Sequence, residues 1–190
     1  MSELLFNELP RPTFRWLRVN HTVSSLAGED TAVQSIAVEA NKDILSPLPV
    51  GTALLDGNYE GANKEAVHVL VEKAEGYAIN VPPKAKEVVG IRIDANARVA
   101  NRFQFIVGEG AELEVQFYVT GSGDALTNVS YLNEYDVKEA GKVVVKKVNL
   151  LPEHVQHIEH RYTKLEEKAD VEYINIEIGG SENILNYYHD

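Results

Sequence analysis

Between Asn101 and Gly121, apolar and polar side chains alternate on both sides of a short glycine-containing segment, Gly108-Glu109-Gly110. The apolar positions around this segment are Phe103, Phe105, Val107, Leu113, Val115, Phe117 and Val119. A β-strand directs alternate side chains to opposite faces, so the stretch predicts two strands, each with one face on a core and the other in water. The two glycines give the backbone the freedom to reverse direction between them.

The start of the second strand recurs along the chain. Small residues precede an apolar or alternating run at four comparable positions, which are Ala85, Ala111, Gly141 and Ala169. The intervals between them are 26, 30 and 28 residues. A repeat of this length with a small residue at each corner is typical of a β-solenoid, in which each repeat forms one coil.

The chain before Gly76 follows a different pattern. Asn63 is suited to a helix N-cap, an apolar stripe follows it, and Gly76 provides a stop, so we predict a helix from Asn63 to Ala74. Alternating apolar residues indicate an earlier strand at Ile36, Val38 and Ala40. We therefore expect an N-terminal region with one helix over residues 1–75 and a β core over residues 76–190.

After Gly76 strand follows strand without an intervening helix, which argues against alternating β and α elements. The expected strands include residues 88–93, 129–137, 143–150, 154–165 and 171–178. The predicted fold class is mainly β. The alternation leaves three architectures open, namely a β-sandwich, a β-roll barrel of the cupin kind and a parallel β-helix.

The 190-residue chain carries a formal net charge of −11 and no cysteine. The negative charge disfavours nucleic acid and anionic membrane surfaces as partners. No run reaches the roughly 18 apolar residues that a membrane span needs, and the N-terminal residues do not form an export signal, so we expect a cytoplasmic protein. Without cysteine the chain alone forms no disulfide, thiolate nucleophile or cysteine-ligated metal site.

One basic and aromatic stretch stands out near the N-terminus, where Phe14, Trp16, Leu17 and Val19 are interleaved with Arg15 and Arg18. Such a stretch can bind single-stranded nucleic acid by stacking. Because the remainder of the chain is strongly acidic, we interpret it instead as a segment that docks its aromatic side chains against its own domain.

The polar residues form no recognisable catalytic pattern. His154, His157 and His160 are the one histidine cluster, and we interpret them as polar positions on a solvated strand or loop, with 157 facing away from the other two. The carboxylates of Glu112 and Glu114 are interpreted as the wet side of a strand. There is no His-x-His pair, phosphate loop or Gly-x-Ser-x-Gly, so we predict no enzyme activity and no catalytic, cofactor or metal ligands.

Several stretches, in order, resemble the SufB/SufD family of iron–sulfur cluster assembly proteins, and SufD most closely. They are residues 12–20, 75–84, 101–118, 126–129 and 133–137, and the resemblance covers most of the chain. It implies a right-handed parallel β-helix behind a small N-terminal region, acting in the cytoplasm with a SufB-type scaffold and a SufC-type ATPase. It also implies a non-catalytic role, in which an iron–sulfur cluster belongs to the complex and not to this chain.

The chain departs from the family pattern at its end. The family's C-terminal helical region has no counterpart here, nor do the cysteine and histidine associated there with the cluster, so we expect a β-helix that is truncated at its C-terminal end. Its open last coil is expected to form a homo-oligomer. The predicted partner-contact residues are Val171, Tyr173, Ile174, Ile176 and Ile178.

The alternative is a small β-roll or β-helix protein that binds or acts on carbohydrate. The neighbouring reading frame discriminates the two hypotheses, since an ABC-type ATPase favours the first and sugar-metabolism enzymes favour the second.

Overall fold

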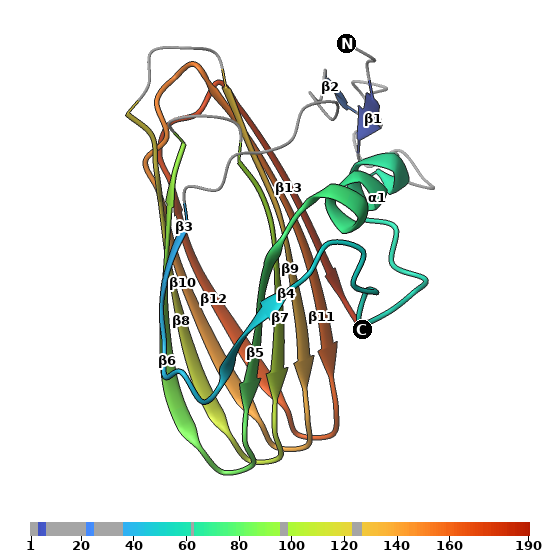
Figure 1. Cartoon of the computed structure of the whole chain (residues 1–190), viewed down its shortest axis with the longest axis vertical. Coiled ribbons are helices and arrows are strands. Elements are labelled where there is room, and N and C mark those ends of the chain that lie inside the picture. Colours follow the sequence, from blue (N-terminus) through green and yellow to red (C-terminus); the bar gives the residue numbers. More distant parts are fainter. Residues whose placement is uncertain (1–3, 7–21, 25–35, 62, 96–98, 123–126) are drawn as a thin grey trace, which may run out of the picture.

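The structure is a computed structural model that describes residues 4–6, 22–24, 36–61, 63–95, 99–122 and 127–190. From Gly76 onward the strands wind into a β-solenoid of about four turns, with two strands in each turn (Figure 1). The turns are β5 (Gly76–Val81) with β6 (Lys86–Asp94), β7 (Val99–Val107) with β8 (Glu112–Thr120), β9 (Thr127–Val137) with β10 (Lys142–Asn149), and β11 (Val155–Leu165) with β12 (Asp170–Glu177), and β13 (Glu182–His189) follows. The predicted mainly β solenoid is confirmed.

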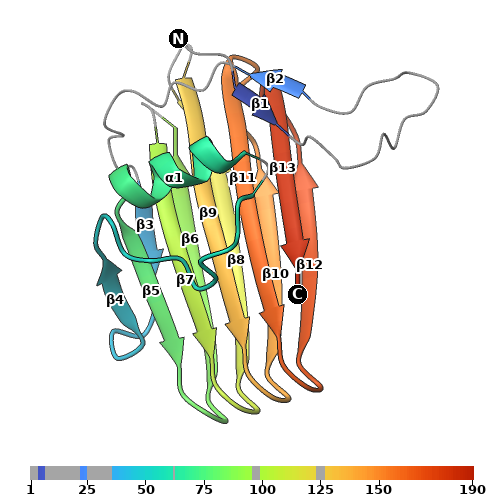
Figure 2. The same cartoon turned by 90° about the vertical axis from the view of Figure 1, so that its right-hand side faces the viewer.

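The strands form two sheets that face each other across the core (Figure 1). One sheet has the order β12-β10-β8-β6-β3 and the other β13-β11-β9-β7-β5-β4, and the solenoid strands within each are parallel. At one end β3 (Ile36–Glu39) and β4 (Leu45–Leu48) add antiparallel strands. At the other end β12 and β13 are the outermost strands (Figure 2).

The same corner turn joins the two sheets in every coil. The residues at its third position, Lys84, Gly110, Ala140 and Lys168, have φ angles of 62, 61, 56 and 61°. The next residue donates its N–H to the carbonyl three positions earlier, as from Ala111 to Gly108 at 3.0 Å. Stacked corners are also bonded to each other, as from the N–H of Ala140 to the carbonyl of Glu167 at 3.0 Å. The predicted corner positions are therefore confirmed.

The unequal lengths of the repeats arise at the opposite corners, where one coil leads into the next. Following each corner, Lys86, Glu112, Lys142 and Asp170 occupy one register position across four strands. At the far ends of these strands the connections differ in length, and β9 and β11 have 11 residues where β7 has 9. One side of the solenoid is thus regular, and variation in length is confined to the other.

Aromatic side chains fill the middle of the core. The ring of Phe105 stacks on Tyr135 with centroids 4.6 Å apart, and that of Phe117 stacks on Tyr131 at 6.1 Å. The ring of Phe103 meets Phe117 edge-on at 5.7 Å. All five lie on the inward phase of their strands, as the alternation predicts.

The helix α1 (Lys64–Lys73) lies across the outer face of the β13 to β4 sheet (Figure 2). The Oδ1 of Asn63 caps it by accepting a hydrogen bond from the N–H of Ala66 at 2.8 Å, and Ala66, Val67 and Leu70 are buried against the sheet. The predicted helix is confirmed. The pair β1 (Leu4–Phe6) and β2 (Thr22–Ser24) lies beside α1 in both views.

The expectation that one face of each central strand is wet is wrong for β7. The side chains of Arg102 and Gln104 are buried on its outer face, because α1 and residues 49–61 before it cover this part of the sheet. The predicted basic and aromatic segment, Phe14 to Val19, lies outside the described residues.

Candidate functional site

The interior of the solenoid changes from apolar to charged near the β12 and β13 end. Ile91, Phe117 and Lys147 occupy equivalent register positions on β6, β8 and β10, so a lysine stands where the earlier turns have large apolar side chains. We call the polar side chains that cluster here the polar layer. Its members are Tyr131, Asn133, Lys147, Asn149, His157, Glu159, Arg161, Glu177, Asn183 and Tyr187.

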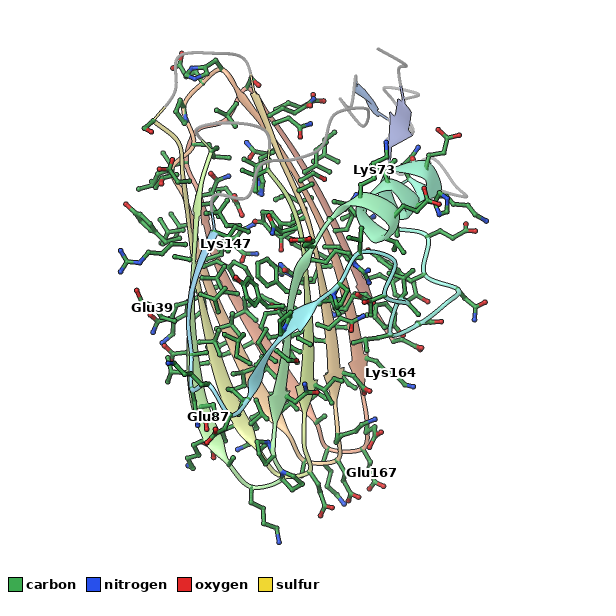
Figure 3. All side chains as sticks on the ribbon, in the orientation of Figure 1. Glu39, Lys73, Glu87, Lys147, Lys164 and Glu167 are labelled. Atoms are coloured by element: carbon green, nitrogen blue, oxygen red, sulfur yellow. The ribbon has the colours of Figure 1, made fainter. Side chains whose placement is uncertain are left out.

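Two cations and two carboxylates lie at the centre of the polar layer. The Nζ of Lys147 contacts the carboxylates of both Glu159 and Glu177, and lies between the sheets in Figure 3. Arg161 approaches Glu159 through Nη2 at 2.7 Å and Nε at 3.2 Å. Asn133 donates a further hydrogen bond to Glu159 at 3.1 Å. Because Glu159 receives so many donors, its charge is stabilised without water.

The guanidinium of Arg161 is enclosed by the last two strands. It lies 4.0 Å from the ring centroid of Tyr173 on β12 and 3.9 Å from that of Tyr187 on β13. Cations are attracted to the faces of aromatic rings, and most strongly where water is excluded. The two tyrosines therefore cover the ionic centre on the side of the open end.

A histidine extends the polar layer toward the connection between β12 and β13. The Nε2 of His157 lies 2.9 Å from the hydroxyl of Tyr131, and Nδ1 lies 3.1 Å from both Asn149 and Asn183. The amide of Asn149 also donates to Glu177 at 2.9 Å. These bonds join strands β9, β10, β11, β12 and β13 into one network.

The electrostatics fix the charge states of two members. Burial alone would raise the pKa of Glu159, but the charges of Lys147 and Arg161 outweigh it and hold that pKa at about 2. Burial lowers the pKa of His157, and the charge of Lys147 acts in the same direction. At neutral pH Glu159 is ionised and His157 is neutral.

The arrangement is suited to holding charges and less to reacting with a solute. Glu159 and Lys147 have fully buried side chains and are paired with each other, whereas Glu177 is 21% exposed. Within the described ranges, no group of three or more His, Asp or Glu side chains is placed to hold a metal ion.

A second buried ionic cluster lies on the outer face of the sheet beneath α1. Arg102 contacts Glu134 at 3.1 Å and donates to the carbonyl of Thr52 at 2.6 Å. Gln104 donates to the carbonyl of Ala53 at 2.8 Å, and the N–H of Leu55 donates to Glu134 at 2.7 Å. We call these contacts the outer clamp, because they fix residues 52–55 to the sheet. Burial raises the pKa of Glu134, against the effect of its donors.

The predicted partner-contact residues divide between two faces of β12 and the residue after it. Val171 and Tyr173 are half-buried and point inward over the last layer of the core. The side chains of Ile174, Ile176 and Ile178 are on the outer face and are 43, 48 and 60% exposed. The structure thus gathers the three isoleucines into one patch beside the sheet edge and separates the other two from it.

The prediction that the histidine cluster is solvated is wrong for two of its three members. His157 and His160 are fully buried, the first in the polar layer and the second beneath Gly61, although they face opposite ways as predicted. His154 is half-buried just before β11. Sequence reasoning also missed Lys147 and Asn149 as interior residues. The sequence did contain a signal for this. Lys147 and Asn149 continue the alternation of Val143 and Val145, which predicts that their side chains point inward.

Comparison with known proteins adds no identity, since no protein-family model, curated protein or solved structure matches the chain. None of the helices in the described part is long and apolar enough to cross a membrane.

Replacing Lys147 by methionine tests the ionic centre. The Lys147→Met variant leaves Glu159 buried without one of its two cations, and we expect a loss of about 3 to 5 kcal/mol in the free energy of unfolding. The matched control is Lys146→Met, which removes an exposed pair with Glu114 and should change that free energy by no more than about 1 kcal/mol. Urea unfolding measures both, and equal effects would contradict the buried pair.

The pH dependence of stability tests the burial of His160. Burial lowers its pKa from 6.5 to about 4, so the folded state disfavours the charged form. His160 therefore leaves the free energy of unfolding unchanged above pH 6.5. As the pH drops toward 4, protonation of this group in the unfolded state lowers that free energy by about 3 kcal/mol. We expect His160→Gln to flatten the unfolding free energy between these pH values. A His160→Gln variant whose unfolding free energy keeps the wild-type slope over this pH range would contradict the assignment.

Proposed function

We propose that the chain is a non-catalytic, SufD-like component of a Suf-type iron–sulfur cluster assembly complex in the cytoplasm, working with a SufB-type scaffold and a SufC-type ATPase. Two of the resembling stretches coincide with repeating units of the solenoid. Residues 76–81 form β5, and residues 101–118 lie on β7, the corner turn and β8. In this proposal the polar layer has a structural role, because it closes the core near a docking surface.

The observation that carries the proposal is the unpaired edge of the last turn. In the described part of the chain β12 pairs with β10 alone and β13 with β11 alone. The N–H of Asp170 donates to the carbonyl of Gly141, just before β10, and the N–H of Ile178 donates to the carbonyl of Asn149, at the end of β10. Alternation therefore directs the N–H groups of the odd-numbered residues between them, such as Asn175, toward the free edge. An open edge of this kind is a template for a strand from another chain.

The surroundings of this edge define the partner. β12 and β13 are the outermost strands of the two sheets and run in opposite directions (Figure 2). An end-to-end contact about a two-fold axis would therefore pair each free edge with an antiparallel strand. The exposed Ile174 and Ile176 lie directly beside the edge and add apolar area to such a contact. A second copy of this chain or a SufB-type solenoid supplies the matching edge.

Co-expression with the SufC-type ATPase and the SufB-type scaffold of the same organism tests the proposal. We expect a complex that survives size-exclusion chromatography, with its mass measured by light scattering. The Asn175→Pro variant removes an edge N–H and should release the solenoid partner, whereas Asn175→Ala keeps that N–H and should retain it.

Two results would contradict the proposal. One is a chain that binds neither Suf protein but retains a defined glycan on an array, which would favour a carbohydrate-binding role. The other is a complex that is equally stable with both Asn175 variants, which would place the contact away from the β12 edge.

A further inference from the structure

The outer face of the β12 to β3 sheet has a depression of about 560 Å³ over β6, β8 and β10. In the described part of the chain α1 is the one helix, and it lies on the other sheet, at the opposite side of the solenoid (Figure 1). We call this hollow the sheet-face depression. The residues that shape it are Glu39, Gly90, Arg92, Gln116, Tyr118 and Lys146. The proposed function makes no use of it.

A missing side chain opens the depression. Gly90 is on the outward phase of β6, between Val89 and Ile91, whose side chains are buried in the core. It pairs with Glu39 on β3 and with Gln116 on β8, so the gap lies between two polar side chains. The nearest atom to a Cβ added at Gly90 is the Cβ of Glu39, at 3.6 Å, which is ordinary van der Waals contact. Packing does not require the glycine, and a glycine within a strand often marks the close approach of a ligand.

An aromatic ring stands beside this gap. Tyr118 points outward from β8, between Arg92 on β6 and Val148 on β10, and is 45% exposed. Gly90 is its diagonal neighbour, because Gly90 pairs with Gln116, two residues before Tyr118. The ring therefore offers a flat apolar surface next to open space, with a hydroxyl at its end.

Opposite charges cancel on either side of the ring. The Nε of Arg92 lies 3.8 Å from Oε1 of Glu39, and the Nζ of Lys146 lies 2.7 Å from Oε2 of Glu114. Gln116 donates from Nε2 to Glu114 at 2.6 Å, which leaves its own Oε1 as an acceptor. The sheet-face depression thus presents donors and acceptors side by side without a net charge.

We propose that the sheet-face depression binds an uncharged saccharide, with one sugar ring stacked on Tyr118. A sugar ring has an apolar C–H face, which packs on an aromatic ring, and hydroxyls around its edge, which both donate and accept hydrogen bonds. The exposed ring of Tyr118 matches the first feature, and the paired polar side chains match the second. The gap at Gly90 lets the sugar approach the backbone of the sheet.

The charges disfavour other classes of ligand. An anion would have to displace the carboxylate of Glu39 or Glu114 from its cation, and the net charge of −11 repels it further. An apolar helix or a second sheet would remove both ion pairs from water without replacing their hydrogen bonds. Sugar hydroxyls instead donate to the carboxylates and accept from the cations, so the pairs stay satisfied.

Retention on immobilised polysaccharides tests the class of ligand. The neutral probes are glucans, xylans, mannans and galactans, and polygalacturonate is the anionic comparison. We expect the full-length protein to bind at least one neutral polysaccharide more tightly than polygalacturonate. No retention, or polygalacturonate bound as tightly as any neutral probe, would overturn the proposal. Such a failure would leave the proposed function standing, because its own test measures binding to protein partners.

Variants test the position of the site, with affinities for oligosaccharides of the best neutral probe measured by titration calorimetry. Tyr118→Ala should weaken binding by about tenfold or more, because a central aromatic anchor supplies much of the binding energy. Tyr118→Phe keeps the ring and should weaken binding less than Tyr118→Ala does. Circular dichroism checks that both variants are folded.

A steric block gives a second test that leaves the fold intact. Gly90→Val fills the gap and should abolish binding, while the space around the added Cβ and the strand preference of valine preserve β6. The matched control, Val88→Ile, enlarges an exposed side chain on the same face of β6 outside the depression and should bind as the wild type does. Wild-type affinity in either Tyr118→Ala or Gly90→Val would overturn the proposal.

Discussion

The register between stacked coils is the constraint on which the rest of the structure depends. Each corner residue with positive φ, including Ala140 and Lys168, adopts a conformation that costs an L-residue about 1 kcal/mol or more. The hydrogen bonds between stacked corners offset this cost, and they form only when the next coil repeats the same turn. Once the corners are aligned, the alternation of each strand sends its apolar side chains inward at matching heights.

A uniform apolar interior would make every coil an equally good neighbour for every other coil. The polar layer removes that equivalence near the β12 and β13 end, because Lys147, Glu159 and Arg161 are stabilised by one another and by polar and aromatic side chains of neighbouring strands. Its charges fix which strands are adjacent in this part of the solenoid. The buried outer clamp has the same effect on residues 52–55, which it fixes in one position on the sheet.

Much of the fold could be predicted from the sequence because local signals agree with it. Ala85, Ala111, Gly141 and Ala169 mark the corners, and the α1 cap and stripe are complete. The buried charges could not be predicted in the same way. Arg102 and His160 occupy the outward phase of their strands, and only the tertiary placement of α1 and the segment before it removes them from water. Lys147 lies on the inward phase, but its burial depends on carboxylates 12 and 30 residues away.

Disulfide cross-linking between neighbouring coils tests the parallel register most directly. Because the chain has no native cysteine, only the introduced cysteines can form a disulfide. Lys86, Glu112, Lys142 and Asp170 are exposed and share one register position, with neighbouring Cα atoms about 4.8 Å apart in such a ladder. Cysteines at Glu112 and Lys142, or at Lys142 and Asp170, should form a disulfide readily. Cysteines at Lys86 and Lys142, one coil further apart, should not. Equal cross-linking of all three pairs, or of the last pair alone, would contradict the stacked coils.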